Sequence, residues 1–230
     1  MKRFRSTALL TLSMLFCLAA QAAAQAINSP YRFIDEKQAG GPFVGYLLTS
    51  EGALGLAPKS GPIFGGRYTI RLSGPFVVEA DIGYFNSTRS VRDTVVVDSA
   101  RRVVGDADFS ALHGIASLRF NITGPRTWHS IQPFVLFGAG GVVDISPRTN
   151  IDDDVSADAR FDFGTSFAGQ LGGGIEWFPS RRFTVRVDAR NLLWKITTPT
   201  GFLLGEFGAR APGDEWLQNG QFTVGVSLHF

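Results

Sequence analysis

QFTVGVSLHF, residues Gln221–Phe230, ends the chain and alternates strictly between apolar residues and small or polar ones. A period of two over this length predicts a β-strand with one apolar face and one polar or crowded face. About ten residues is also the length of a tilted strand that crosses a lipid bilayer. The last residue, Phe230, is aromatic, as expected where an apolar outer face ends in an aromatic girdle. The stretch therefore predicts a membrane-spanning strand.

The beginning of the chain has the features of a secretory signal peptide. A positive start, with Lys2, Arg3 and Arg5, precedes the apolar stretch Thr7–Ala20 and the small residues Ala22–Ala24, which suit cleavage. The apolar stretch is short for a bilayer, which disfavours a membrane-anchor helix as the alternative. The expected division of the chain is a leader, a periplasmic segment and one barrel domain, at residues 1–24, 25–41 and 42–230.

Charge and cysteine content exclude several classes of function. The whole chain has 22 Lys and Arg against 20 Asp and Glu. The leader holds three of the basic residues and none of the acidic ones, so the mature chain is nearly neutral. Such a balance gives no reason to expect nucleic acid as a partner. The one cysteine, Cys17, lies in the leader, which excludes disulfides, thiol catalysis and cysteine metal sites. We expect neither a cofactor nor a metal.

Seven further segments alternate in the same way and predict further strands. Together with the terminal strand they lie at residues 43–50, 62–72, 76–85, 108–122, 131–145, 163–178, 182–193 and 221–230. The connections are long after every odd strand and short after every even one. Short turns at one end and long loops at the other are typical of a transmembrane barrel. The predicted fold class is all-β, an eight-stranded antiparallel up-and-down transmembrane β-barrel.

Two of the long connections carry their own expectations. Residues 86–107 contain two apolar runs, Thr94–Val97 and Val103–Val104, on either side of the polar run DSARR, which favours a hairpin that stands above the membrane. Residues 194–220 have no clear period and are expected to form a loop. An aromatic girdle is expected at the short-turn end, from Phe76, Trp177, Phe178, Phe183 and Phe230, with ordinary core packing as the alternative.

The segment GQLGGGIEWFPSRRFTVRVDAR, residues 169–190, joins a glycine-rich strand, a tight turn and an alternating strand. With the terminal Phe230 it resembles the small eight-stranded outer-membrane barrels of the OmpA/OmpX type, over roughly residues 40–230. The resemblance implies a place in the bacterial outer membrane, in contact with membrane lipid and lipopolysaccharide. It also implies that Val226, Leu228 and Phe230 form the signal read by the outer-membrane assembly machinery. The scaffold hosts many functions, so the resemblance indicates the fold rather than the activity.

Charged residues of both signs fall on the inward-facing phase of the predicted strands. They are Arg67, Arg71, Glu79, Asp81, Arg119, Asp144, Glu176, Arg186, Asp188 and Arg190. An eight-stranded barrel is just wide enough for side chains to fill. We therefore expect these charges to pair in a polar plug that closes the lumen. A gated path for ions or small solutes is the alternative. Glycines 172–174 are expected to make room for inward neighbours.

Two groups of residues could carry chemistry. His113 and Ser117 face inward near acids of other strands, the composition of a Ser/His/acid hydrolase. Their spacing of four differs from the closely spaced pair of lipid A deacylase barrels, so a hydrogen-bonding histidine in the lumen is the interpretation preferred and no enzyme is predicted. Asp152–Asp154 and Asp158 form an acidic run that could bind Ca²⁺, although a solvated loop is the simpler interpretation.

The function predicted is structural or surface-interacting: a closed, polar-filled barrel that displays extracellular loops whose ligand the sequence does not identify. A narrow pore for ions or small solutes is the first alternative. A soluble lipocalin-like carrier is the second, and it would require a polar exterior around an apolar cavity.

Overall fold

The computed structural model describes residues 29–94, 103–147, 149–203 and 212–230. The expected leader, residues 1–24, lies outside the described part. The strands are β1 Tyr31–Phe33, β2 Gln38–Leu48, β3 Gly61–Arg71, β4 Phe76–Arg92, β5 Val103–Asn121, β6 Arg126–Trp128, β7 Ile131–Asp144, β8 Thr165–Trp177, β9 Phe183–Thr197 and β10 Asp214–His229. The short helices α2, η2 and η3 span Asn150–Asp153, Ala157–Ala159 and Thr200–Leu203. None of the helices in the described residues is long and apolar enough to cross a membrane.

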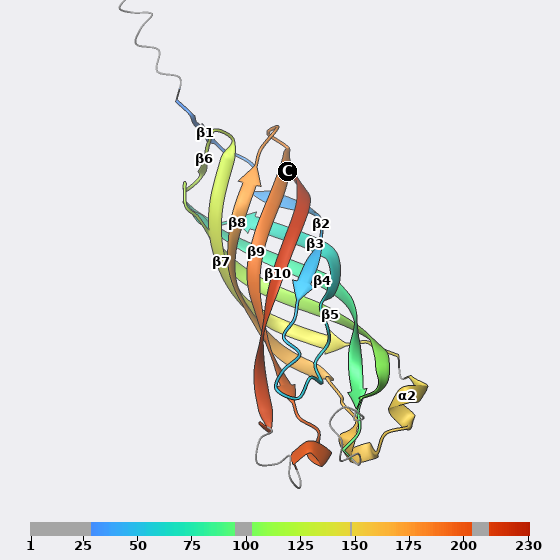
Figure 1. Cartoon of the computed structure of the whole chain (residues 1–230). Coiled ribbons are helices and arrows are strands. Elements are labelled where there is room, and N and C mark those ends of the chain that lie inside the picture. The colour runs from blue at the N-terminus through green and yellow to red at the C-terminus, as the bar shows by residue number, and fades with distance from the viewer. Residues whose placement is uncertain (1–28, 95–102, 148, 204–211) are drawn as a thin grey trace, which may run out of the picture.

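Eight of these strands form a closed antiparallel ring, which confirms the predicted fold (Figure 1). Each strand pairs with its neighbours in the order β2, β3, β4, β5, β7, β8, β9 and β10, and β10 returns to β2. The terminal strand closes the ring: Val224 is opposite Val187 of β9 and Val44 of β2. Closure matters because no edge N–H or C=O then faces the hydrocarbon of a membrane.

The two faces of the sheet follow the alternation of the sequence. Large apolar side chains point outward and are exposed on every strand of the ring, such as Phe137 at 60%, Val187 at 56% and Phe222 at 52%. The residues between them, such as Arg186 at 1% and Gln221 at 0%, are buried in the lumen. This arrangement confirms the predicted phase. It is the reverse of the polar exterior that a soluble carrier would need, so that alternative is wrong.

Several strands are longer than the sequence pattern predicts. β4 and β5 continue to Arg92 and back from Val103, so the expected hairpin above the membrane is present, its tip lying outside the described residues. β9 runs to Thr197 and β10 starts at Asp214, where a loop was expected. The reason is that Trp194, Ile196 and Leu217 face inward and are buried, so the ladder extends as far as the apolar lumen does.

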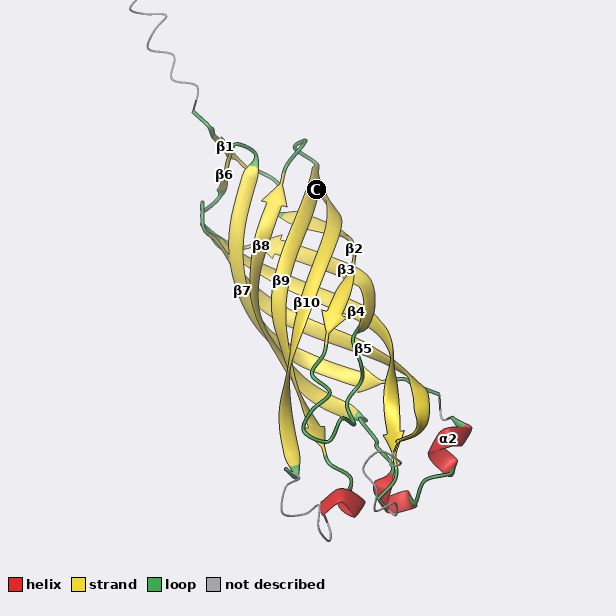
Figure 2. Cartoon of the chain, viewed as in Figure 1, coloured by secondary structure: helices red, strands yellow, loops and turns green. Residues whose placement is uncertain are grey.

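The N-terminal segment does more than precede the barrel. β2 begins at Gln38, earlier than the predicted Phe43, and its first residue exchanges two backbone hydrogen bonds with Phe230. Before it, residues 34–37 form a strap from the β1–β6 pair to β2 at the end of the barrel that holds the short turns (Figure 2). Ile34 of this strap is buried and donates its N–H to Pro125 O at 3.1 Å.

Candidate functional site: the filled lumen

A buried network of ion pairs crosses the middle of the lumen. Glu79 of β4 is fully buried and is surrounded by three guanidinium groups. Arg186 Nη1 lies 2.5 Å from its Oε2, Arg190 Nη2 lies 2.7 Å from its Oε1, and Arg67 Nε lies 3.2 Å from Oε1. A buried carboxylate without such partners would be strongly destabilising. The three arginines therefore make the buried position of Glu79 tolerable.

Two further carboxylates balance these arginines. Asp188 of β9 accepts hydrogen bonds from Arg186 Nε at 3.0 Å and Arg190 Nε at 2.6 Å, and Arg67 Nη2 lies 3.3 Å from it. Asp81 of β4 accepts from Arg190 Nη1 at 3.0 Å. Three guanidinium groups thus meet three carboxylates, so the middle of the lumen carries charges of both signs without a net excess from these six groups.

His113 and Ser117 both belong to this network. His113 Nε2 lies 3.0 Å from Asp81 Oδ2, and Ser117 Oγ accepts a hydrogen bond of 2.6 Å from the amide of Gln170. The same amide donates to Asp81 Oδ1 at 3.1 Å. The contacts of both residues are therefore those of a hydrogen-bonding lining, as expected for a lumenal histidine.

A second ion pair lies nearer the short-turn end. Arg119 of β5 donates to both oxygens of Glu176 on β8, at 2.6 and 2.5 Å, in the bidentate geometry that makes such pairs strong. Its Nε donates to Asn121 at 2.7 Å. Arg186 Nη1 lies 3.8 Å from Glu176 Oε1 and links this pair to the central network. The ring of Phe134 is 4.1 Å from the guanidinium carbons of both Arg119 and Arg186.

The structure brings together most of the predicted lumen charges but not all. Those that join the network are Arg67, Glu79, Asp81, Arg119, Glu176, Arg186, Asp188 and Arg190. Arg71 and Asp144 face inward as predicted but lie at opposite ends of the barrel, Arg71 at the end with the short turns and Asp144 at the end with the long loops. Arg71 Nη1 makes a long hydrogen bond of 3.5 Å to Ile34 O, and Asp144 Oδ1 accepts from the backbone of Ser146 at 2.8 Å. The alternation of a strand shows that a side chain faces the lumen, but it does not show how far along the barrel axis that side chain lies.

Glycine makes room for the network, as predicted, at Gly172 and Gly174 but not at Gly173. A Cβ on Gly172 would lie 2.9 Å from Arg190 Cγ, and one on Gly174 would lie 2.6 Å from Asp188 Cβ. A Cβ on Gly83 would lie 2.9 Å from His113 Nε2. Gly173 lies between these two on the outward phase. The inward glycines are thus the positions where a neighbouring charged side chain crosses directly over the backbone.

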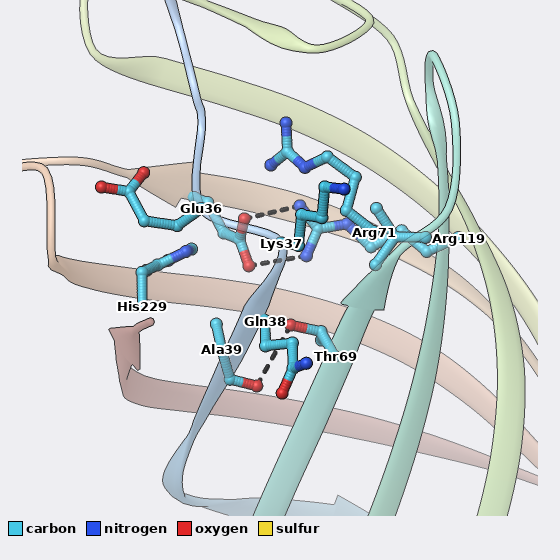
Figure 3. Close-up of a pocket in the computed structure, with 10 residues that line it drawn as sticks. Glu36, Lys37, Gln38, Ala39, Thr69, Arg71, Arg119 and His229 are labelled. Atoms are coloured by element: carbon cyan, nitrogen blue, oxygen red, sulfur yellow. Dashed lines mark hydrogen bonds and ion pairs between the residues drawn. The ribbon is translucent and has the colours of Figure 1, made fainter.

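The strap and the last residues of the ring close the short-turn end (Figure 3). The strap's Glu36 and Lys37 come together here with Arg71, Arg119 and His229 around a cavity of only about 10 Å³, room for one water molecule. His229 Nε2 is within 3.2 Å of Thr184 Oγ1. Phe178, expected in the lipid-facing girdle, is instead 1% exposed and packs on His229 with ring centroids 5.3 Å apart. For Phe178 the girdle prediction was wrong and its alternative, core packing, holds, because the residue follows β8 and turns inward.

The half of the lumen nearer the long loops is apolar, although the charged inward residues predicted a polar plug. Phe43, Leu47, Ile63 and Leu192 are each almost fully buried there. A chain of edge-to-face rings crosses the lumen from Phe85 through Phe109 and Phe163 to Trp194, with centroids 6.1, 5.7 and 5.9 Å apart. Phe163 comes from the β7–β8 connection. The expected polar plug therefore fills only part of the lumen, and a hydrophobic core fills the rest.

The long loops share a second core above the first. It joins Leu56, Val91, Val155 and Phe202, which come from the four long connections or the strand extensions beside them. Asp152 Oδ1 accepts from Arg89 Nη2 at 2.5 Å and its Oδ2 from Thr149 Oγ1 at 2.8 Å. The first aspartate of the acidic run thus holds α2 on the β4–β5 hairpin, and no group of at least three possible metal ligands occurs within the described residues.

A comparison with protein families agrees with this architecture. The model of the outer membrane protein beta-barrel domain family matches residues 8–230. Solved structures with a similar fold include the N-terminal barrel of Pseudomonas aeruginosa OprF (9% identity, 85% of this chain and 98% of that chain, TM-score 0.47) and Neisserial surface protein A (12%, 88% and 98%, 0.48). Another is Ail, the attachment invasion locus protein of Yersinia pestis (13%, 85% and 99%, 0.41). Among curated proteins none matches.

Proposed function

Since the chain belongs to the family of outer membrane protein beta-barrel domains, we propose that it acts in the bacterial outer membrane as a closed scaffold for its extracellular loops. Its role is structural or surface-interacting, and it is neither a channel nor an enzyme. The observation that carries this proposal is the continuous filling of the lumen, from the strap to the loops, by packed side chains.

The filling has three successive layers. The strap and His229 lie at the short-turn end, the ion-pair network centred on Glu79 occupies the middle, and the core around Phe109 and Trp194 lies beneath the loops. A hydrated pore needs lining charges that water reaches. Here the side chains of Arg186 and Glu79 are 1% and 0% exposed. The ion pairs between residues on opposite walls of the barrel hold these walls together across the lumen, and this supports a closed barrel.

The described parts of the loops support a role in surface interaction because they pack together into one body. The second core ties all four long connections to each other, and the pair between Arg89 and Asp152 ties α2 to the hairpin. A loop ordered before it binds loses less conformational entropy on binding. The shared core thus makes the loops a preformed platform for a partner at the cell surface, and lipopolysaccharide remains the expected neighbour at its rim.

Planar-bilayer recordings test the closed state. The refolded protein, checked by its heat-dependent gel mobility, is added to a bilayer and compared with a vesicle-only control. The proposal expects no stepwise conductance. Reproducible unitary steps from the wild-type protein would favour the narrow pore instead. In the same preparation, absence of ester hydrolysis with lipid A as substrate is expected, and a measurable rate that His113→Ala abolishes would overturn the non-enzymatic interpretation.

A second experiment addresses the platform. Cells that display the wild-type protein are compared with cells that display a variant in which the exposed Asp153, Asp154 and Asp158 are all replaced by serine. Outer-membrane integrity, read as resistance to bile salts, reports the structural role, and adhesion to host-cell layers reports the surface role. Loss of adhesion with normal resistance supports surface interaction. If cells that display the wild-type protein match cells lacking it in both adhesion and resistance, the protein has neither role.

A further inference from the structure

A small two-stranded ribbon stands beside the ring at its short-turn end (Figure 1). β1 pairs with β6 in antiparallel register, with Tyr31 opposite Trp128 and Phe33 opposite Arg126. β6 lies in the connection between β5 and β7. Neither strand is needed to close the barrel, because the eight other strands already do so. The ribbon therefore calls for a separate explanation.

The ribbon has two unlike faces. Directly opposite residues of a strand pair point to the same side, so Tyr31, Phe33, Trp128 and Arg126 share one face. All four are exposed, the three aromatic residues at 48%, 57% and 49%. On the other face Thr127 is completely buried. Three aromatic rings exposed side by side on so short an element are unusual for a surface in contact with water alone.

This aromatic face continues the outer surface of the barrel. Trp128 is opposite Ile131 of β7, and Ile131 is opposite Trp177 of β8. Trp177 is 51% exposed on the outward face, which contacts lipid in an outer-membrane barrel. One row of side chains thus runs from Tyr31 through Trp128 and Ile131 to Trp177. The ribbon extends the lipid-facing surface sideways at the level of the periplasmic girdle.

The ribbon also carries a cation without an acidic partner. The guanidinium carbon of Arg126 lies 4.4 Å from the centre of the Phe33 ring. Within the described residues, no carboxylate is paired with Arg126. Tyrosine and tryptophan favour the interface of a membrane, where their rings meet acyl chains and their polar atoms meet headgroups. A guanidinium held at that level matches a lipid phosphate in geometry and charge.

We propose that the β1–β6 ribbon lies on the inner leaflet of the outer membrane, with Tyr31, Phe33 and Trp128 at the boundary between headgroups and acyl chains. Arg126 pairs with the phosphate of an anionic phospholipid. The strap holds the ribbon in place, and the ribbon fixes how deeply the barrel sits. This inference goes beyond the proposed function of the loops and does not depend on what they bind.

Depth measurements with single labels test the location of the ribbon. Outside the expected leader the chain has no cysteine, so Phe33→Cys and the matched control Glu36→Cys, which is half-buried on the strap beside the polar mouth of the lumen, each carry one nitroxide. Both are refolded into vesicles of phosphatidylethanolamine with one-fifth phosphatidylglycerol. The label at position 33 is expected to collide more with oxygen than with a water-soluble nickel chelate, and the label at 36 the reverse. Equal access of the nickel chelate to both labels would overturn the proposal, since the ribbon would then stand in water.

A charge variant tests the anionic lipid. An environment-sensitive fluorophore on Tyr31→Cys reports insertion while the phosphatidylglycerol fraction is raised. Arg126→Gln is expected to need about fivefold more phosphatidylglycerol for half of the response, the effect of one cation near a membrane surface. Arg160→Gln, at the opposite end of the molecule, is the control and should leave the titration unchanged. An unchanged titration in Arg126→Gln, with folding confirmed by gel mobility, would reject the pairing with phosphate.

Discussion

Arg186 and Glu79 stand on opposite walls of the barrel and meet in its centre. Their closest atoms, Nη1 and Oε2, are 2.5 Å apart, although the two residues are 107 positions apart in the sequence. β4 and β9 are separated by three strands on either side of the ring. The pair is therefore a strut across the lumen, and its energy depends on the closed barrel that excludes water from it.

Removal of the central carboxylate should destabilise the barrel strongly. In Glu79→Gln three guanidinium groups lose their shared partner while they stay buried, and breaking one side of a buried ion pair costs about 3–5 kcal/mol. Urea unfolding in lipid vesicles, followed by tryptophan fluorescence, measures the change in the free energy of unfolding. Glu51→Gln, on an exposed loop, is the control and should change it by less than about 0.5 kcal/mol. Equal stability of the two variants would mean that water reaches the network.

A charge on the lipid-facing side should cost free energy according to its depth. Val187 lies near the middle of β9 on the outward face, and arginine there should destabilise the inserted barrel by about 2–4 kcal/mol. Thr197 is on the same strand and face but at its extracellular end, so Thr197→Arg should cost at most about 1 kcal/mol. Both values come from unfolding in vesicles. The opposite order of the two costs would contradict the assigned depth.

The inward glycines should tolerate no side chain. Gly174→Ala places a Cβ against Asp188 Cβ and against the backbone of β9, which cannot move without breaking the ladder. Overpacking of this kind costs about 1–3 kcal/mol. Gly114 faces outward with no atom within 4 Å of an added Cβ, so Gly114→Ala is the matched control and should be neutral or slightly stabilising. Thermal unfolding in detergent compares the two, and similar melting temperatures would refute the steric argument.

The sequence was sufficient to predict the ring and the direction in which its side chains point. An alternation with period two needs no partner to be recognised, and a bilayer outside the barrel makes the apolar phase unambiguous. For this reason Phe222 and Val187 were placed outward, and Arg186 and Glu79 inward, as the structure has them. Strand ends were less predictable, because the extensions that carry Trp194 and Leu217 lie outside the membrane, where outward residues need not be apolar.

Heights and partners along the lumen could not be predicted, because they depend on register and tilt between strands. Arg71 and Arg119 both face inward, yet one lies at the mouth and the other in the network. The apolar upper core was also missed. Phe43, Phe85 and Phe109 occupy inward positions, but an aromatic residue in an alternating strand suggests the lipid face unless the phase of its neighbours is followed. The β1–β6 ribbon is too short to give a periodic signal.

The loop cap is the second core together with α2 on the β4–β5 hairpin. Acid should loosen the packing of this cap before it unfolds the barrel. Burial alone would raise the pKa of Asp152, but hydrogen bonds from Arg89 and Thr149 outweigh it and lower the pKa below the ordinary value. A lowered pKa means that this carboxylate stabilises the cap above about pH 4 and that the effect disappears as pH falls through the lower, folded-state value. Cleavage of the loops by pepsin between pH 4.5 and 2 should therefore accelerate toward the acid end.

The matching variants isolate this carboxylate from the general effect of acid. Asp152→Asn should cleave about fivefold faster than the wild type at pH 4.5, equivalent to about 1 kcal/mol for a partly exposed pair, and should show a weaker pH dependence. The carboxylate of Asp153 is mostly exposed and comes no nearer than 3.7 Å to Arg160 Nη2, so Asp153→Asn should behave like the wild type. Parallel pH profiles for all three proteins would show that Asp152 does not link the cap to pH.

Phe230 contributes both a backbone contact and an exposed ring, and different variants can separate the two. The backbone of Phe230 exchanges hydrogen bonds with Gln38 at 2.9 and 3.2 Å, so it completes the seam between β10 and β2. Its side chain is 67% exposed and touches Tyr68 with ring centroids 6.4 Å apart. Phe230→Ala keeps the seam and removes only the ring, whereas deletion of Phe230 removes both. If the ring is the assembly signal, Phe230→Ala should refold in detergent within about 0.5 kcal/mol of the wild type. In cells it should reach the outer membrane at a small fraction of the wild-type level and accumulate in the periplasm.

Phe76→Ala is the control, because Phe76 is a girdle ring at the same end of the barrel, 5.6 Å from Phe120, but lies far from the chain terminus. Normal membrane levels of Phe230→Ala, or an equal loss in Phe76→Ala, would show that the machinery does not read this residue. Failure of Phe230→Ala to refold in detergent would instead assign the ring to packing of the seam.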